Sequence, residues 1–417
     1  MLIHLESPDY AALQLGGGTL GLLEALAFSS DGQRLVVRAT FTDNADGGAT
    51  LHYGAWVYDL PQQVYSLSLN ALVAGSEAQA RNYDVLDVSV AGDSGALTMV
   101  VQSKQRGVAS DESVLSLVID GTVVEPNLLN AWLGLGVNPR IEKFQLSDDG
   151  RFLAVQTDNP LLAPDTDPDI NESSDIYLID LDTKQVERVS FIGGAGVNDP
   201  VELGNIIVDD GEVKVTFTTT AAFDADDQNG DANSVHEQTD AYLWSRAFGA
   251  SGLTGTAVFD LLSVGQNGLA AGSVAQGASI VTASGVYFQS ASDDLVVDDF
   301  NESDDVFFRN EQGAVFRVEP LGIGEIESGA FLASADMAGR QVAVLSVSPD
   351  VVGQVPVQQF VSVDVETGNW QVVSADEQTI ANDWVVSGVV SASGSGYAFT
   401  STASNLSDRA IESFQGD

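Results

Sequence analysis

Short runs of alternating hydrophobic and polar residues recur along the chain, and a glycine-centred turn precedes each of seven such runs. Typical phrases are SDDGRFLAV around Gly150 and SGSGYAFTS around Gly396. Alternation with period two, bounded by Gly, Asp and Ser, is typical of β-strands joined by tight turns. The seven turn glycines are Gly32, Gly95, Gly150, Gly211, Gly285, Gly339 and Gly396.

The unit around Gly150 contains further strand signals that define its size. An alternating run at 151–155 is followed by a polar loop, an apolar strand at 176–180 and another at 186–190. With the apolar run before the turn, each unit supplies four strands, which is one antiparallel propeller blade. The spacing of about 60 residues is longer than in the commonest propeller repeats. The sequence therefore predicts an all-β, seven-bladed β-propeller with four-stranded antiparallel blades.

The two ends of the chain are expected to meet in the last blade. The seventh unit contains strand signals at 389–401, whereas residues 1–15 read as two strands around a turn at Ser7-Pro8-Asp9. Closing a propeller in this way leaves no free sheet edge. We therefore expect one domain, 1–417, in which residues 1–15 complete the last blade together with residues 386–417.

Three units resemble the repeats of bacterial TolB-like (PD40-type) propellers. The motif reads FTSTASNLSD at 399–408, FQSASDDLVVDDFNESDDVFF at 288–308 and TDNPLLAPDTDPDINESSDIYL at 157–178. The resemblance implies a propeller fold and an extracellular or periplasmic location, although the given chain shows no signal peptide. The family includes binding platforms, periplasmic transport accessories and a few metal-dependent enzymes, so the resemblance implies no single activity.

The composition excludes several classes of function. The chain carries 60 acidic and 16 basic residues, a formal net charge of −44, so a nucleic-acid partner is not expected. Cysteine is absent, which excludes disulfides and thiol chemistry. No apolar stretch approaches the length of a membrane span, so membrane insertion is not expected. We expect a monomer or one domain of a larger protein.

Acidic loops before the third strands are the candidate metal sites. Alternating Asp and Asn residues direct several hard oxygens to one centre, the ligand set that Ca²⁺ prefers. The alternative is that Asp and Asn form Asx-turns that shape the loops. The candidate ligands are Asp165, Asp167, Asp169, Asn171 and Asp175 in the third unit, Asp224, Asp226, Asn229, Asp231 and Asp240 in the fourth, and Asp298, Asp299, Asn301 and Asp305 in the fifth.

Histidine and tryptophan offer few candidates for catalysis or sugar binding. Of three histidines, only His236 lies in an acidic insertion, and His4 and His52 are expected to be packing or surface residues. The five tryptophans are expected in the core or against turns. No nucleophile elbow, zinc-binding His pair or dinucleotide fingerprint occurs.

Two classes of function remain. The sequence favours a non-catalytic interaction module, a rigid acidic propeller stabilised by Ca²⁺ that binds a protein or glycan partner. The alternative is a metal-assisted polysaccharide lyase or hydrolase, since paired carboxylates also perform glycosidase chemistry when they converge across a cleft. No catalytic residue is assigned.

Overall fold

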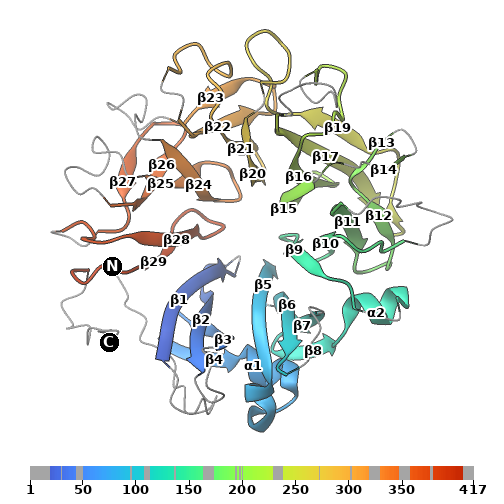
Figure 1. Cartoon of the computed structure of the whole chain (residues 1–417), viewed down its shortest axis with the longest axis vertical. Coiled ribbons are helices and arrows are strands. Elements are labelled where there is room, and N and C mark those ends of the chain that lie inside the picture. The colour runs from blue at the N-terminus through green and yellow to red at the C-terminus, as the bar shows by residue number, and fades with distance from the viewer. Residues whose placement is uncertain are drawn as a thin grey trace.

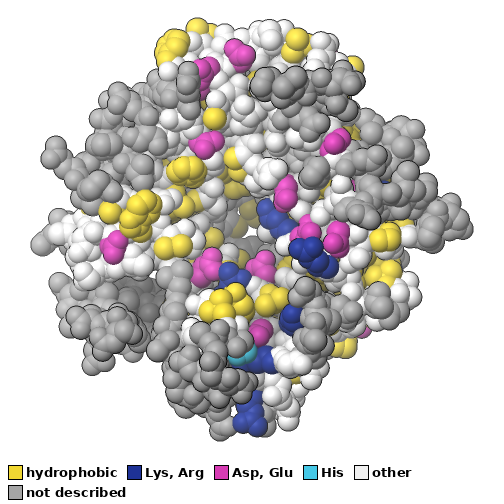
Figure 2. Space-filling model, viewed as in Figure 1, with side chains coloured by type: hydrophobic (Ala, Val, Ile, Leu, Met, Phe, Trp, Pro, Cys, Tyr) yellow, Lys and Arg dark blue, Asp and Glu magenta, His cyan; other side chains and the backbone are white. Residues whose placement is uncertain are grey.

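The computed structural model is a β-propeller whose blades follow one another around a central axis (Figure 1). The space-filling view is hollowed along this axis, and we call the hollow the channel (Figure 2). The structure describes residues 19–29, 31–43, 50–93, 96–107, 113–135, 138–162, 173–192, 195–196, 199, 201–228, 238–271, 273–300, 303–318, 329–346, 357–375 and 379–406. In the described ranges, no helix is long and apolar enough to cross a membrane.

Each blade is an antiparallel meander whose strands run in order from the channel to the periphery. Blades 1 to 3 comprise β1 (Thr19–Phe28), β2 (Arg34–Asp43), β3 (Thr50–Asp59) and β4 (Val64–Ser68), then β5 (Tyr83–Asp93), β6 (Ala96–Gln105), β7 (Val114–Ile119) and β8 (Thr122–Glu125), then β9 (Ile141–Leu146), β10 (Phe152–Thr157), β11 (Asp175–Asp180) and β12 (Val186–Arg188). The strands expected at 151–155, 176–180 and 186–190 are thus confirmed.

The next three blades follow the same plan. They comprise β15 (Val201–Asp209), β16 (Glu212–Thr219), β17 (Asp240–Gly249) and β19 (Val258–Leu261), then β20 (Val274–Thr282), β21 (Gly285–Ser290), β22 (Asp305–Asn310) and β23 (Val315–Arg317), then β24 (Ala330–Ala335), β25 (Gln341–Ser346), β26 (Gln359–Asp364) and β27 (Trp370–Val372). The minor elements are β13 (Phe191–Ile192), β14 (Ala195–Gly196), β18 (Gly252–Leu253), α1 (Leu69–Ala74), α2 (Leu128–Leu133) and a 3₁₀-helix (Glu77–Asn82).

The predicted count of seven four-stranded blades is wrong. Six blades are present in the described residues, and β28 (Val385–Val390) and β29 (Tyr397–Ser401) form a two-stranded sheet between blades 6 and 1. The glycine phrase marks the turn between the first and second strands, so it counts hairpins rather than complete blades. The predicted contribution of residues 1–15 lies outside the described residues.

The hydrophobic core lies between the blades and follows the period-two alternation of the strands. In β10, Phe152 and Ala154 pack toward blade 4 with Trp244. Leu153 and Val155 point to the other face and pack toward blade 2 with Leu117. Each blade is therefore held by apolar contacts on both faces.

A polar side chain at an equivalent position of the second strand links most blades to the next. Gln156 Oε1 accepts a hydrogen bond from Leu203 N at 2.8 Å, and Gln289 Oε1 accepts one from Leu332 N at 3.0 Å. Thr400 of β29 accepts one from Ala25 N and donates to the carbonyl of Leu23, at 3.3 and 3.1 Å. The hairpin β28–β29 thereby joins blade 1 as a complete blade would. The second-strand positions that make such links are Arg38, Gln102, Gln156, Thr218, Gln289 and Thr400.

Candidate functional site

The first strand of each blade begins on the same face of the propeller on which the second strand ends, because the two are antiparallel. The loops between second and third strands therefore lie on this face as well, and they include the acidic loops. We call it the loop face. The turns between first and second strands, and those between third and fourth strands, lie on the opposite face.

Three of the predicted metal ligands begin third strands and are buried. Asp175, Asp240 and Asp305 are at most 2% exposed. Asp175 Oδ1 accepts a hydrogen bond from the Ser190 hydroxyl at 2.6 Å, and Asp240 Oδ1 accepts one from Ser263 at 2.6 Å. Each serine in turn accepts the N–H of the residue after the aspartate. These carboxylates thus fix the start of a strand.

Two buried arginines supply positive charge to the acidic loops. Arg188 at the end of β12 forms an ion pair with Asp175, with 2.5 Å between Nη2 and Oδ2, and both side chains are at most 2% exposed. Arg317 at the end of β23 lies 3.4 Å from Asp299 Oδ1 and also donates to the carbonyl of Asp298. In blades 3 and 5, therefore, an arginine compensates part of the carboxylate repulsion that suggested a metal ion.

The loop of blade 4 is anchored through Asp227, one of the acidic residues of this loop in the sequence. Asp227 is buried and accepts a hydrogen bond from the Tyr242 hydroxyl. Burial, and secondarily this carboxylate, raise the pKa of Tyr242 far above its usual value, so the phenol stays protonated. Asp224 caps the turn by accepting from Asp226 N at 2.8 Å, which is the Asx-turn alternative. Asp226 is exposed.

The remaining candidate ligands do not converge in the part of the molecule that the structure describes. No group of three or more acidic or histidine side chains there is arranged to hold a metal ion. Asp298 is exposed beside the buried Asp299. The candidates outside the described residues are Asp165, Asp167, Asp169, Asn171, Asn229, Asp231 and Asn301, together with His236.

A second group of charged residues, not singled out from the sequence, lines the channel. It occupies one register position of the first strands, opposite the linking residue of the second strand. We call this the rim position. It is occupied by Glu24 in β1, Asp87 in β5, Lys143 in β9 and Glu202 in β15. In β24 the corresponding residue is Phe331, which lies opposite Leu345.

The rim charges of blades 1 to 3 are partly desolvated, and hydrogen bonds from Arg38 and Lys143 reach carbonyls of the next blade. Arg38 of β2 bridges Glu24 Oε2 at 2.7 Å and the carbonyl of Leu86 in blade 2. Lys143 Nζ donates to the carbonyl of Leu203 in blade 4 at 2.5 Å. Burial lowers the pKa of Lys143, opposed by the nearby carboxylates of Glu202 and Asp87. Figure 2 shows basic and acidic side chains gathered around the central hollow.

Two carboxylates converge where blades 3 and 4 meet. Gln156 Nε2 donates to Glu142 Oε2 and to Glu202 Oε2, each at 3.1 Å. Arg140 lies 3.8 Å from the other oxygen of Glu142 and has 61% of its side chain exposed. The two glutamates therefore share a neutral amide donor, and both retain access to solvent.

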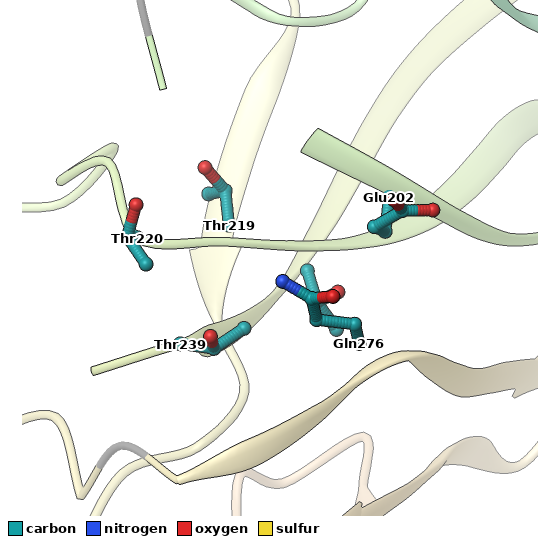
Figure 3. Close-up of a pocket in the computed structure, with 6 residues that line it drawn as sticks. Glu202, Thr219, Thr220, Thr239 and Gln276 are labelled. Carbon is teal, nitrogen blue, oxygen red and sulfur yellow. The ribbon is translucent and has the colours of Figure 1, made fainter. Parts of the chain in front are cut away.

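A small hollow of about 220 Å³, which includes its open mouth, adjoins Glu202. Threonines from the ends of the blade 4 loop surround it together with Gln276 of β20 (Figure 3). Gly277 has φ +66° and donates its N–H to Thr218 Oγ1 at 2.8 Å, and a Cβ there would lie 3.4 Å from Lys143 Nζ. The lining residues are Glu202, Thr218, Thr219, Thr220, Thr239 and Gln276.

The rim on the other side of the channel is apolar. Phe331 in β24 is 41% exposed, and Val386 in β28 and the preceding Trp384 are each 48% exposed. Hydrophobic side chains are correspondingly visible over β24 to β28 at the left of Figure 2. Since these side chains lie at or beside the starts of first strands, they lie on the loop face. The mouth of the channel thus has a charged half and an apolar half.

The expected core positions of Trp56 and Trp244 and the expected packing of His52 are confirmed, whereas His4 lies outside the described residues. Trp56 and Trp244 are buried in the core, whereas Trp384 is half exposed, contrary to expectation. His52 is partly buried, and its Nδ1 lies 3.2 Å from Asp84 Oδ2. Arg106 donates to the other oxygen of Asp84 at 2.8 Å. This triad joins blades 1 and 2.

Asp87→Asn is expected to be more stabilising at pH 7 than at pH 3.5. Burial raises the pKa of Asp87, so the folded chain binds more protons than the unfolded chain above about pH 4. The stability of the parent protein therefore falls as pH rises through that window, whereas asparagine stays neutral and keeps the acceptor for Val88 N. Denaturant unfolding at both pH values measures the difference, with the exposed Asp293→Asn as control. If the free energy of unfolding differed between Asp87→Asn and the parent by the same amount at both pH values, the raised pKa of Asp87 would be contradicted.

No protein-family model matches the chain, and no curated protein matches it. Among solved structures, the chain is similar to acylaminoacyl peptidase from Pyrococcus horikoshii, with 11% identity, 75% of this chain and 42% of that chain covered, and a TM-score of 0.40. It is similar to a prolyl endopeptidase with 11% identity, coverage of 86% and 41%, and a TM-score of 0.44. It is also similar to the GH74 xyloglucanase from Xanthomonas campestris, with 11% identity, coverage of 92% and 52%, and a TM-score of 0.42. The chain spans about half or less of each of these proteins, and likeness at this level carries no inference about activity.

Proposed function

We propose that this chain is a non-catalytic interaction module that binds a protein partner on the loop face, at the mouth of the channel. The division of the mouth into an apolar and a charged half is the observation that supports the proposal. Exposed aromatic and aliphatic side chains beside polar groups are the usual composition of a protein-binding surface. Further exposed hydrophobic residues on the same face, Val297 and Phe300, extend the apolar half into the blade 5 loop.

The pairing of the rim charges is consistent with a fixed surface. Glu24 and Arg38 form an ion pair, and Lys143 is held by a carbonyl of the next blade. Side chains positioned by such contacts lose little conformational freedom on binding, which favours recognition by a preorganised surface. The resemblance of three units to TolB-like repeats, a family that includes binding platforms, supports the same proposal.

We include in the proposal an extracellular or periplasmic location, a monomer or one domain of a larger protein, and Ca²⁺ bound in the acidic loops. Asp175 and Asp299 each form an ion pair with an arginine, so other carboxylates of the loops would be the ligands of Ca²⁺. Asp224, Asp226 and Asp298 are the described candidates that have access to solvent.

A double variant on the loop face tests the binding surface. Phe331→Ser with Val386→Ser is expected to weaken binding of peptides selected on an array by tenfold or more, because it removes two apolar contacts. The matched control is Val258→Ser with Val124→Ser, since these valines are 59% and 49% exposed but lie on outer strands. Affinities are measured by calorimetry. Equal weakening by both double variants would contradict the proposed location.

Glycoside hydrolysis is the second candidate, and the pair of Glu142 and Glu202 favours it. Their Oε2 atoms share one amide nitrogen, and paired carboxylates at such short separation perform acid–base and nucleophilic chemistry in glycosidases. Turnover of a polysaccharide panel that Glu202→Gln reduces by about 10²-fold or more would support this candidate over the binding module. Absence of turnover in the parent protein, with peptide binding retained, would exclude it.

A further inference from the structure

Within the proposed binding function, on which this inference rests, we propose that the partner presents an extended basic amphipathic segment. Its lysine or arginine would bind to Glu142 and Glu202 from their solvent-exposed side, and its hydrophobic side chains would lie on the apolar half formed by Phe331, Trp384 and Val386. The occupant is thus a protein segment with cationic residues in one half and apolar residues in the other, and the side chains that face the propeller are spaced by two.

The charged half favours a cation. Glu142 and Glu202 approach one nitrogen, Gln156 Nε2, at 3.1 Å each, so their charges lie close together. Their hydrogen-bond donors are neutral, since the Ser174 hydroxyl is the other group that donates to Glu142 Oε2. A guanidinium or ammonium group has several N–H donors and pairs well with two carboxylates. Lys143 is already engaged by the Leu203 carbonyl, and Arg140 approaches Glu142 only at 3.8 Å.

The adjoining hollow has the polarity that a cationic side chain needs. Threonine hydroxyls and the amide of Gln276 surround the hollow, with Glu202 at its edge (Figure 3). Hydroxyl and amide oxygens accept hydrogen bonds from an ammonium group without adding charge. A lysine side chain entering from the channel mouth would lay its aliphatic stem against the threonine methyl groups.

The apolar half follows directly along the rim. Glu202 lies in β15, Gln276 in β20 and Phe331 in β24, which are the first strands of three consecutive blades. Val386 and Trp384 lie at the next position around the channel. An extended segment crossing these strands would therefore meet polar groups first and apolar side chains second. In an extended segment, successive side chains point to opposite sides, so the residues of the partner that face the propeller are spaced by two.

The negative net charge of the whole chain also favours a basic partner. A formal net charge of −44 attracts a basic segment and repels an acidic one over the distance that salt permits. This long-range term is not specific for the loop face, so the experiment must separate it from local recognition.

The probe is a fluorescein-labelled peptide in which two lysines and then two leucines occupy every second position, with serine between them, and its binding is measured by anisotropy. We call it the leucine–lysine peptide. Glu142→Gln with Glu202→Gln is expected to weaken binding by tenfold or more. The control, Glu311→Gln with Glu366→Gln, makes the same change of net charge at exposed positions in turns on the opposite face, and it is expected to change affinity less than twofold. A peptide with acetylated lysines should bind at least tenfold more weakly than the parent peptide.

The outcomes separate this inference from the binding function itself. If both double variants weakened peptide binding equally, the binding would depend on the net charge of the chain and not on Glu142 and Glu202. This result would overturn the inference. Peptides from the array that require Phe331 and Val386 but lack basic residues would overturn it as well, while the binding function stands. Binding to neutral glycans, or to vesicles, with no response to the leucine–lysine peptide would contradict both.

Discussion

Arg188→Met is expected to lower the free energy of unfolding by about 3–5 kcal/mol, because it leaves the buried carboxylate of Asp175 without its cation. Both side chains are at most 2% exposed, and Nη2 and Oδ2 are 2.5 Å apart. Asp175 also holds Ser190, which fixes the start of β11, so the loss affects the blade 3 scaffold. Urea unfolding followed by circular dichroism measures the effect.

A neutral double variant provides the control for this prediction. Arg188→Met with Asp175→Asn removes both charges and keeps an acceptor for the Ser190 hydroxyl. It is expected to recover at least half of the stability that the single variant loses, because the uncompensated charge is gone. If the double variant were less stable than Arg188→Met alone, the buried charge would not be the cause of the loss.

Gly204→Ala is expected to destabilise the protein by about 1–3 kcal/mol, because the added methyl group has no space. Gly204 lies at an irregularity of β15, between Leu203 and Ile206, where the strand comes close to β20. A Cβ there would lie 2.4 Å from Thr216 Oγ1 and 2.6 Å from the carbonyl oxygen of Ser279. Backbone atoms cannot rotate away, so β15 itself must shift.

Gly249→Ala is the matched control for this steric effect. Gly249 ends β17, and a Cβ built on it meets nothing within 4 Å. Its substitution is expected to change stability by less than about 0.5 kcal/mol, as at most surface positions. Thermal melts of both variants in one buffer measure the contrast. Similar melting temperatures would contradict the close approach of β15 to β20.

The strands and turns were predictable because they depend on local patterns. Gly150 adopts φ +76° in its turn, and Ser147 and Asp149 cap that turn by hydrogen bonds. The number of blades was not predictable in the same way, because the repeated phrase marks only the first hairpin of a blade. In the last unit, the glycine with a positive φ is Gly394, at +70°, two residues before Gly396, which was assigned to this turn from the sequence.

In the acidic loops, an aspartate in the sequence is compatible both with a metal ligand and with a structural hydrogen-bond acceptor. Asp175 and Asp240 carry the composition of metal ligands, yet each occupies the first position of a third strand and pairs with a serine from a later segment. That pairing depends on the fold and leaves no mark in the spacing of the acidic residues. Calcium binding by the acidic loops stays a prediction.

The charged rim was missed because its residues are far apart in the sequence. Glu24, Lys143 and Glu202 come together only through the register of β1, β9 and β15 with their second strands. A signal was present in the second strands, where a polar residue precedes Ser or Thr in VVQS, AVQT and FQS. This polar residue links two blades only because the blades are arranged in a ring, and the spacing of residues in the sequence does not show that arrangement.

Hydrogen exchange in the presence of the leucine–lysine peptide tests the central claim most directly, because it locates binding without any substitution. We expect slower exchange on the loop face, in β15 near Glu202, in β24 near Phe331 and in β28 near Val386. The outer strands β8, β19 and β23 should exchange as in the free protein. Protection confined to those outer strands, with none at the channel mouth, would contradict the claim that the loop face is the binding surface.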